Sequence, residues 1–497
     1  MKNNKIIIYV FVIVLLIIIL GAIVKASLFD NATNSSSKYS SINTTQIEQE
    51  DSRGDTEYSD YTAEINLSIL EVNGTGASVS GTTITIIKEG TYYFTGTLSD
   101  GNIVVKAGDN ANVVLVFDNA NITSRKTAVI NGITAKNIYI NLKEGSVNTF
   151  TDSSSYTEFT EDDEPNATVF SKTDLIISGT GSLIVNANYE DGIVSKDDLI
   201  ITDATLTVNS ADDGIRGKDS VDIKNANITI NAKGDGIKST NDSDSAKGYI
   251  IIDGGTYTIS SGDDGIHAET SIIINSGTID IQKSYEGIEA KYIEINGGDI
   301  SITASDDGIN AADGSGSSEF GSMVNNNSSN ASVQLVVNGG DIYVNAQGDG
   351  LDANGSITMT GGTVKVAGTT NNGNGALDYD RNFNITGGTL VVYGATGMWQ
   401  NTSNSSTQYA ICFGTSGKAG DSIELKDSSG NIIESFETEK AYGAILISNS
   451  KLTKGETYTL YVNGAAVSSQ ELTNIITSNH SNQGGMMGGE MQGNRRR

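Results

Sequence analysis

Cysteine, proline, histidine and positive charge are all scarce in this chain of 497 residues. The only cysteine, Cys412, has no second cysteine to pair with, so the core must form by burial without an intrachain disulfide. His267 and His480 are the only histidines, so we expect neither a histidine-based triad nor a multi-histidine zinc site. Lysine and arginine number 31 against 60 acidic residues, a net charge of -29, so nucleic acid is not an expected partner.

Long apolar runs are also missing, except at the amino-terminal end. There, residues 6–24 are apolar and follow two lysines, which is typical of an export signal. A cleaved signal peptide has an apolar stretch of about 7–15 residues and a membrane span about 20, so this length favours an anchor, although Ala26 would suit cleavage. We expect residues 1–26 to be a signal peptide or membrane anchor, residues 27–62 a polar linker, and the remaining chain extracellular at the cell surface.

What the chain does contain is a repeat. The 57 glycines, with abundant Ile, Val, Thr and Asn, favour β-structure with tight turns. Two pairs of apolar residues return together at a spacing close to 22, in nine sets that cover 36 positions. The sets are Leu175, Ile177, Leu183, Val185; Leu199, Ile201, Leu206, Val208; Val221, Ile223, Ile228, Ile230; Ile250, Ile252, Tyr257, Ile259; Ile272, Ile274, Ile279, Ile281; Ile293, Ile295, Ile300, Ile302; Leu335, Val337, Ile342, Val344; Ile357, Met359, Val364, Val366; and Phe383, Ile385, Leu390, Val392.

The spacing within and between pairs predicts the fold. Residues two apart share one face of a strand. A unit of about 22 residues is too short for a helix with its crossover and too long for a nine-residue calcium-roll repeat, but it fits three short strands. We therefore predict an all-β fold, a right-handed parallel β-helix. It is a single-stranded solenoid whose coils stack at about 4.8 Å around aliphatic columns.

We place this solenoid at residues 63–393, a small C-terminal β domain at 394–475 and a disordered tail at 476–497. Residues 238–248 and 311–331 lengthen the spacing and are expected to be loops. The repeat is weaker in the first coils, where the best match sets Val114, Val116 and Ile122 against Ile138, Ile140 and Val147. An acidic, serine-rich insertion follows them at 150–168, and it separates these coils from the clear repeat.

A phrase of acid, glycine and apolar residue recurs at one corner of the units. The seven acids before the glycine are Asp191, Asp213, Asp235, Asp264, Glu286, Asp307 and Asp349, and Asn374-Gly375-Ala376 ends the series without one. The residue after the apolar one must face outward, because its two neighbours point inward. These outward residues are Val194, Arg216, Lys238, His267, Glu289, Asn310 and Asp352.

Two interpretations of the stacked acids are open. Asp-Gly is a favoured turn pair, because Asp bonds nearby backbone and Gly accepts a positive φ. However, Glu286 keeps the carboxylate although Glu has no comparable turn preference. Like charges stacked at about 4.8 Å repel by about 1 kcal/mol per pair in water, so the second interpretation is a binding site for a cation.

Calcium suits this column, because it is a hard cation that takes roughly six to eight oxygen ligands. We predict Ca²⁺ as the cofactor. The candidate ligands are Asp213, Asp235, Asp264, Glu286, Glu289, Asp307, Asn310, Asp349 and Asp352. The richest cluster should join Asp264, Glu286, Glu289, Asp307 and Asn310, and a second should join Asp349 and Asp352 with Asp378 and Asp380.

Other side chains at this corner have two interpretations each. Arg216 and Lys238 either form cross-coil salt bridges, which are common and weak, or create a subsite for a uronic acid carboxylate. Tyr189 and Tyr285 precede acidic turns and either stack on sugar rings or simply cover the corner. We expect His267 to be an exposed member of the outward row and not a catalyst.

Three phrases carry a resemblance to a known family. They are Lys283-Ser284-Tyr285-Glu286-Gly287-Ile288-Glu289, Ser305-Asp306-Asp307-Gly308-Ile309-Asn310 and Ser171-Lys172-Thr173-Asp174-Leu175. From about residue 65 to 470 the chain resembles the cell-surface carbohydrate-binding β-helix family of cellulolytic clostridia, a pectate-lyase-like solenoid. The resemblance implies bound calcium, with the carboxylates above as ligands, and affinity for cellulose and acidic pectic polysaccharide without demonstrated cleavage. Gly234, Gly348 and Asn374 depart from the acidic pattern, so the resemblance does not extend metal sites to their coils.

Three functions remain open. The leading hypothesis is a monomer that binds polysaccharide, either cellulose or an acidic pectic polymer, with calcium bridging the column to a uronate. The second is a calcium-dependent uronate lyase, in which Lys238, Arg216 or Lys196 removes the proton beside the carboxylate. The third is a structural or adhesive surface rod that calcium stiffens.

Overall fold

The computed structural model describes residues 58, 60–159, 164–313 and 332–480, and these residues form strands and connecting turns without any helix. Consequently, none of them forms a helix that could cross a membrane. The predicted leader at 1–26, nearly all of the linker and most of the loop at 311–331 lie outside the described residues.

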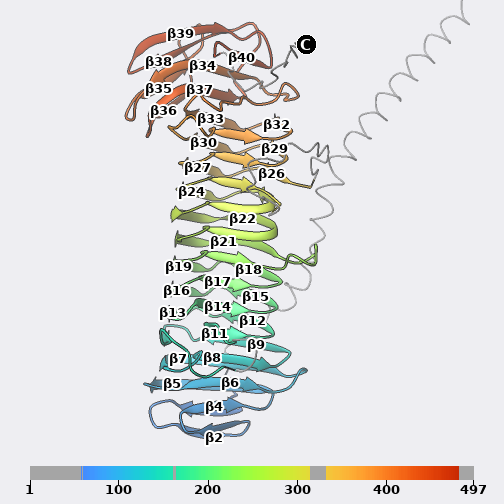
Figure 1. Cartoon of the computed structure of the whole chain (residues 1–497), viewed down its shortest axis with the longest axis vertical. Coiled ribbons are helices and arrows are strands. Elements are labelled where there is room, and N and C mark those ends of the chain that lie inside the picture. Colours follow the sequence, from blue (N-terminus) through green and yellow to red (C-terminus); the bar gives the residue numbers. More distant parts are fainter. Residues whose placement is uncertain (1–57, 59, 160–163, 314–331, 481–497) are drawn as a thin grey trace, which may run out of the picture. The chain divides into compact units, whose positions relative to one another are not determined.

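Three ladders of parallel strands make up the solenoid, and each coil contributes one strand to each ladder (Figure 1). Ladder 1 contains β4 (Thr83–Ile86), β6 (Asn102–Lys106), β8 (Ile130–Thr134), β11 (Ala167–Ser171), β14 (Asp191–Ser195), β17 (Ile215–Gly217), β20 (Ile237–Ser239), the start of β22 (Ile266–Ser284), the start of β23 (Ile288–Ile295), β25 (Ile309–Ala311), β28 (Leu351–Ala353) and β31 (Leu377–Tyr379).

The other two ladders share several long strands that bend from one to the next. Ladder 2 contains β1 (Ala63–Asn66), β5 (Gly90–Leu98), β7 (Asn112–Thr123), β9 (Asn137–Leu142), β12 (Asp174–Ser178), β15 (Asp198–Thr202), β18 (Ser220–Lys224), β21 (Tyr249–Ser260), parts of β22 and β23, β26 (Gln334–Val337), β29 (Ser356–Met359) and β32 (Asn382–Ile385). Ladder 3 contains the ends of β5, β7, β21 and β22 with β10 (Val147–Thr151), β13 (Ser182–Ala187), β16 (Thr205–Ser210), β19 (Asn227–Asn231), β24 (Asp299–Ala304), β27 (Asp341–Ala346), β30 (Thr363–Ala367) and β33 (Thr389–Gly394).

The aliphatic interior is the one that the repeat predicts. All 36 predicted core positions are at most 2% exposed. Each predicted step along the chain is also a strand pairing, so that Ile223 lies opposite Ile252 and Ile302 lies opposite Val344 across the loop. The β-helix and its register are therefore confirmed over the nine clear coils, and ladder 1 supplies the third strand of each coil.

In the first coils the predicted register is wrong at two places, by one residue at Val114 and by three at Val147. Val113, and not Val114, lies opposite Ile138 and points into the core. Val147 is 55% exposed, and Phe150 fills the interior in its place. At Val113 the cause is that the run NVVLVF is apolar at consecutive positions, and a strand that is apolar on both faces does not indicate which face is buried.

Antiparallel strands close both ends of the solenoid. At the start, β2 (Glu71–Gly74) pairs with β1, and β3 (Ala77–Ser80) pairs with β4. At the other end, β37 (Tyr442–Asn449) pairs with β33 and with β34 (Ala410–Gly417), so ladder 3 does not end in an open edge. Residues 476–478, which the sequence assigned to the tail, form β40 (Ile476–Ser478) beside β34.

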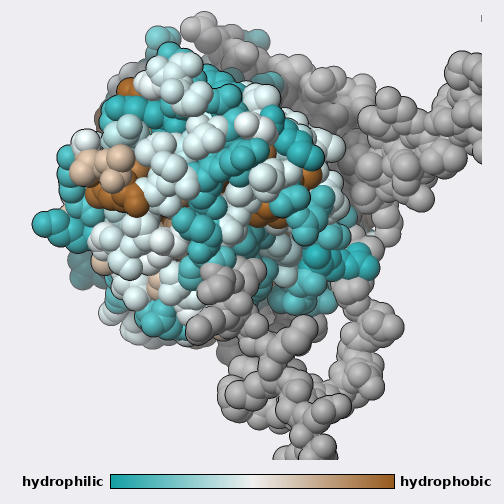
Figure 2. Space-filling view, turned by 90° about the horizontal axis from the view of Figure 1, so that it is seen from above, coloured by the Kyte–Doolittle hydropathy of each residue, from teal (hydrophilic) through white to brown (hydrophobic). Residues whose placement is uncertain are grey.

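A second, antiparallel sheet lies beyond these strands and shares an apolar cluster with β33, β34 and β37. Its strands in order are β36 (Ile432–Glu437), β35 (Ser422–Lys426), β38 (Thr457–Val462) and β39 (Ala465–Glu471). Figure 2 looks onto this end, where hydrophilic and neutral residues predominate and apolar ones form only separate patches. A hydrophilic end surface is what a solenoid cap requires.

Candidate functional site

The acids of the recurring phrase form one continuous row along ladder 1, the carboxylate column. Its members are Asp191, Asp213, Asp235, Asp264, Glu286, Asp307 and Asp349. The carboxylates also bond the coils together: Asp213 N–H donates to Asp191 Oδ1 at 3.1 Å, and Asp235 N–H donates to Asp213 Oδ1 at 2.9 Å. One oxygen of such an Asp thus accepts a backbone hydrogen bond from the next coil, and the other oxygen is left for a cation.

The glycine after each column acid is required for close stacking. None of these seven glycines has a positive φ, so the turn explanation based on that conformation is wrong. A Cβ on Gly287 would instead lie 2.3 Å from Gly308 O in the next coil and 2.3 Å from Ile302 Cγ2 in the core. The absence of a side chain lets the coils approach each other at this corner.

Three successive coils supply their own cations to the column. Arg216 lies 2.5 Å from Asp191 Oδ2 and 3.6 Å from Asp213 Oδ2. Lys238 contacts Asp235 Oδ2 and lies 3.8 Å from Asp213 Oδ2. Both side chains occupy the predicted outward positions and form cross-coil ion pairs that neutralise this part of the column.

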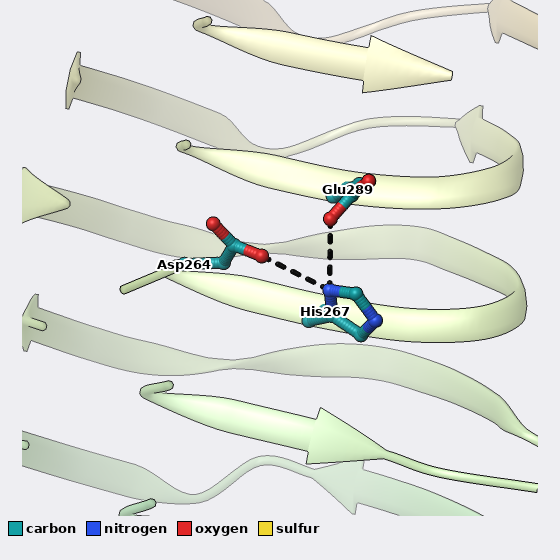
Figure 3. A group of neighbouring side chains, drawn as sticks. All are labelled: Asp264, His267 and Glu289. Atoms are coloured by element: carbon teal, nitrogen blue, oxygen red, sulfur yellow. Dashed lines mark hydrogen bonds and ion pairs between the residues drawn. The ribbon is translucent and has the colours of Figure 1, made fainter. Parts of the chain in front are cut away.

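His267 is the third resident cation (Figure 3). Its Nδ1 lies 3.0 Å from Asp264 Oδ2 and 2.9 Å from Glu289 Oε2, so the ring is between two coils. Burial opposes the charge, but hydrogen bonds to Asp264, Glu269 and Glu289 raise the pKa of His267 to about 12. The side chain is only 20% exposed, whereas the sequence predicted an exposed residue at this position. One imidazolium is therefore shared by two carboxylates of the richest predicted calcium cluster.

Substitution of this histidine should destabilise the protein and make it respond to calcium. In His267→Ala, Asp264 and Glu289 lose their shared cation. We expect the free energy of unfolding in chelator to fall by about 2 kcal/mol, which is less than the loss when a fully buried ion pair is broken. Calcium should restore part of this loss, because the two carboxylates face each other. Urea unfolding followed by circular dichroism measures both effects. Equal stability of variant and wild type in chelator would contradict the role of His267 as a cation.

The column continues beyond His267 without resident cations. Asp307, Asp349 and Asp352 bring carboxylate oxygens within 4.8 Å of one another. Across the described ranges, no lysine, arginine or histidine forms an ion pair with any of the three. Burial, reinforced by neighbouring carboxylates, raises the pKa of Asp307 to about 7 and that of Asp352 to about 8. Three crowded acids thus lack a counter-charge.

Asn310 and Glu286 lie beside these three acids. Asn310 is opposite Asp352 on ladder 1 and is only 8% exposed. Its Nδ2 donates to Glu286 Oε2 at 2.9 Å, whereas its Oδ1 has no hydrogen-bond partner among the described residues. Burial and then Glu289 raise the pKa of Glu286 to about 8. A buried carbonyl oxygen without a partner is costly unless another group satisfies it.

The series of acids ends differently from the prediction. Leu377 lies opposite Leu351, so Gly375, and not Asn374, stands in the place of a column acid. Gly375 N–H donates to Asp349 Oδ1 at 2.5 Å, as the column acids do between other coils. The same register brings Asp378 opposite Asp352. The outward acids therefore extend one coil further than the column acids.

The three candidate lyase bases are all bound to carboxylates. Lys196 lies 2.9 Å from Glu164 of the insertion. Arg216 pairs as described above. Although burial works against the charge of Lys238, Asp213 and Asp235 outweigh it and raise its pKa. A general base must give up its proton near the working pH, and the surroundings of Lys238 favour its protonated form.

The two candidate tyrosines differ in their surroundings. Tyr189 stacks on Tyr156, with ring centroids 4.3 Å apart, so the insertion covers one of its faces. The same insertion buries Val194, which was expected to face solvent, against Tyr156 and Phe170. Tyr285 is 48% exposed beside the column and is the more accessible of the two.

Sequence reasoning missed a second group of acids at the turn before ladder 2. Asp174, Asp197 and Asp198 bring carboxylate oxygens within 4.8 Å of one another. Nearby, Asp219 pairs with Lys247 of the loop at 238–248. The doubled acid in the phrase KDD was the available signal, but it lacks the recurrence that marks the column.

Three comparisons with known proteins bear on this site. A model of a family described as carbohydrate-binding domain-containing protein matches residues 80–331. A curated protein of that description from Acetivibrio thermocellus is 42% identical over 139 residues, which are 28% of this chain and 49% of that protein, so this chain spans about half the length of the relative. A solved structure, described as the polysaccharide lyase-like protein from C. thermocellum in a gadolinium derivative, aligns with a TM-score of 0.43 and 34% identity over 52% of this chain and 98% of that one.

Proposed function

This chain belongs to the family of carbohydrate-binding domain-containing proteins, and from that premise we propose that it binds acidic polysaccharide through calcium held on ladder 1. The observation that carries the proposal is the change along the carboxylate column. The coils from Asp191 to His267 neutralise their acids with side chains, whereas Asp307, Asp349 and Asp352 have no such partner.

The residues at this point fit a hard cation. Carboxylates of Asp307, Asp349 and Asp352 would hold the ion, and the unpartnered Asn310 oxygen offers a neutral ligand of the kind calcium accepts. Since calcium takes roughly six to eight oxygens, positions remain for water or for the ligand. When bound, the ion supplies positive charge that neutralises the acids and attracts an anionic group.

The charge of the protein explains why the ion would matter for the ligand. At a net charge of -29, the protein repels a polymer of uronic acids unless a cation intervenes. The neighbouring Tyr285, exposed and adjacent to the column, offers a ring face for a sugar. The segment 1–26, where it stays uncleaved as an anchor, would hold this surface outside the cell.

Removal of two ligands should abolish capture of an acidic polymer. In the double variant Asp349→Asn and Asp352→Asn, we expect the affinity for polygalacturonate in calcium to fall at least about tenfold, because two charged oxygens leave the site. Affinity electrophoresis in gels containing polygalacturonate, with calcium or with chelator, measures this. The wild type should lose its retardation in chelator, and the double variant should show little in either.

A matched control separates the site from overall charge. Asp299 and Asp341 lie opposite each other on ladder 3 and are exposed, so Asp299→Asn with Asp341→Asn removes the same charge from another face. This control should keep its calcium-dependent retardation. Retardation of the wild type that persists in chelator would count against the proposal, and no retardation in either condition would favour a structural rod.

A further inference from the structure

A second possible binding surface lies at the far end of the solenoid, away from the three crowded acids. It is a groove of about 770 Å³ between the last coil and the strands that close it. Tyr379, Arg381 and Asn382, at the end of β31 and the start of β32, line one part, and the segment 400–405 forms one rim. The other rim is formed by Thr473, Asn474, Ile476, Thr477, Ser478 and His480. The groove lies wholly outside the family match at residues 80–331.

The lining of this groove differs in chemistry from the carboxylate column. Eleven of its fifteen residues are Asn, Gln, Ser or Thr, and none carries a carboxylate. Tyr379 contributes an aromatic ring and Arg381 a planar donor. Amides and hydroxyls both donate and accept hydrogen bonds, so such a wall matches a ligand with many hydroxyl groups. Its polarity also argues against an apolar ligand, which would need predominantly hydrophobic walls.

Two buried polar atoms of the lining have no partner in the described chain. Thr402 is 3% exposed, and its Oγ1 has no hydrogen bond. His480 Nε2, on the opposite rim, is likewise buried without a hydrogen bond to any described residue. A buried polar group without a partner costs free energy, and native structures rarely keep one without a reason. A ligand in the groove supplies such a reason on both rims.

Local hydrogen bonds hold both rims in place. Phe383 N–H donates to Ser403 Oγ at 2.8 Å, and Ser403 N–H donates back to Phe383 O at 2.8 Å. Tyr379 Oη donates to Asn401 O at 2.5 Å. On the other rim, Thr477 Oγ1 accepts from the Thr473 N–H at 3.1 Å. A groove that is ordered before binding loses less entropy when a ligand enters.

We propose that this groove binds a segment of neutral polysaccharide, independently of calcium. This second site is separate from the proposed calcium-dependent site. The two proposals share only the premise that the protein binds carbohydrate. A neutral glycan needs no counter-ion, and the absence of carboxylates from the lining removes the reason for one. Thr402 Oγ1 and His480 Nε2 then hydrogen-bond sugar hydroxyls from opposite rims.

Calorimetric titration of the full chain with cellohexaose, mannohexaose and xylohexaose in chelator tests the proposal. At least one hexasaccharide should bind. Thr402→Val removes only the unpartnered hydroxyl, so it should leave stability unchanged or raised and weaken binding roughly threefold to tenfold. Asn382→Ala, at an exposed lining position, should weaken the same ligand without affecting folding.

A control and the contrary results complete the test. Ser271→Ala removes another buried, unpartnered hydroxyl, on β22, and should bind as the wild type does. The proposal is overturned by binding of none of the three sugars, by wild-type affinity in both groove variants, or by loss of binding in the Asp349→Asn and Asp352→Asn variant. Polygalacturonate capture should be unchanged in Thr402→Val, so failure of one site is distinguishable from failure of the other.

Discussion

Withdrawal of calcium is expected to destabilise the protein most at alkaline pH. For one site with a Kd on the order of 10⁻⁴ M, within the range of extracellular modules, about 10 mM calcium adds about 2.7 kcal/mol to the free energy of unfolding. Only the ionised carboxylates bind the ion, so this gain should shrink as the acids of the site become protonated. The difference in melting temperature between calcium and chelator should therefore increase from about pH 5 to about pH 8.

In chelator alone, the free energy of unfolding should fall as the pH rises. A protein stabilised by a salt-bridged acid shows the opposite dependence. The pKa values of Glu286, Asp307, Asp349 and Asp352 rise to about 8, 7, 6 and 8, above their ordinary values near 4. Between about pH 4 and pH 8 the folded protein then binds more protons than the unfolded chain, so the free energy of unfolding falls as the pH rises. Calcium should flatten this fall.

Differential scanning calorimetry across this pH range, with calcium and with chelator, measures both effects. The Asp349→Asn and Asp352→Asn variant removes two of the acids and should show a shallower fall in chelator and a smaller gain from calcium. Identical melting temperatures with and without calcium at pH 8 would exclude a stabilising ion at this site.

Gly287→Ala is expected to be strongly destabilising for so small a substitution. The new Cβ would meet Gly308 O and Ile302 Cγ2, each at 2.3 Å, so it must push apart the coils and the core together. Overpacking usually costs 1–3 kcal/mol, and because both obstacles are held by the stack, we expect a loss of about 3 kcal/mol or more. Chemical unfolding in saturating calcium measures the loss.

Gly145→Ala is the matched control for this change. A Cβ there meets nothing within 4 Å, and the cost comes only from the positive φ of 72°. A left-handed backbone costs about 1–2 kcal/mol in a residue with a side chain, so this variant should lose clearly less stability than Gly287→Ala. An equal loss in the two variants would show that close stacking is not what requires glycine in the column.

The fold was predictable wherever one face of each strand is apolar and the other is not. From Leu175 to Val392 the spacing of apolar pairs predicts both the buried positions and the strand pairing, because a parallel coil places like residue on like residue. In the first coils, Val113 and Val114 are both apolar, and no periodicity distinguishes them. There the choice of face depends on packing against neighbouring coils, which a single segment does not contain.

The site was predictable in its row of acids and in the outward positions of Arg216 and Lys238, but not in the contacts of His267. Recurrence alone aligned the acids, and the register then placed Arg216, Lys238 and His267 beside them. What spacing could not reveal is that His267 bridges two coils, since this depends on side-chain conformation. The ion pair between Lys196 and Glu164 could not be predicted either, because an insertion has no repeat from which its position can be inferred.

The bonding between coils has a consequence for the length of such proteins. Each aspartate of the column accepts a backbone hydrogen bond from the coil that follows, and coils contact mainly their immediate neighbours. Duplication of one unit, such as residues 215–236, would therefore add a coil that meets the same partners on both sides. Ladder 1 would lengthen by about 4.8 Å with each added unit, without redesign of the core.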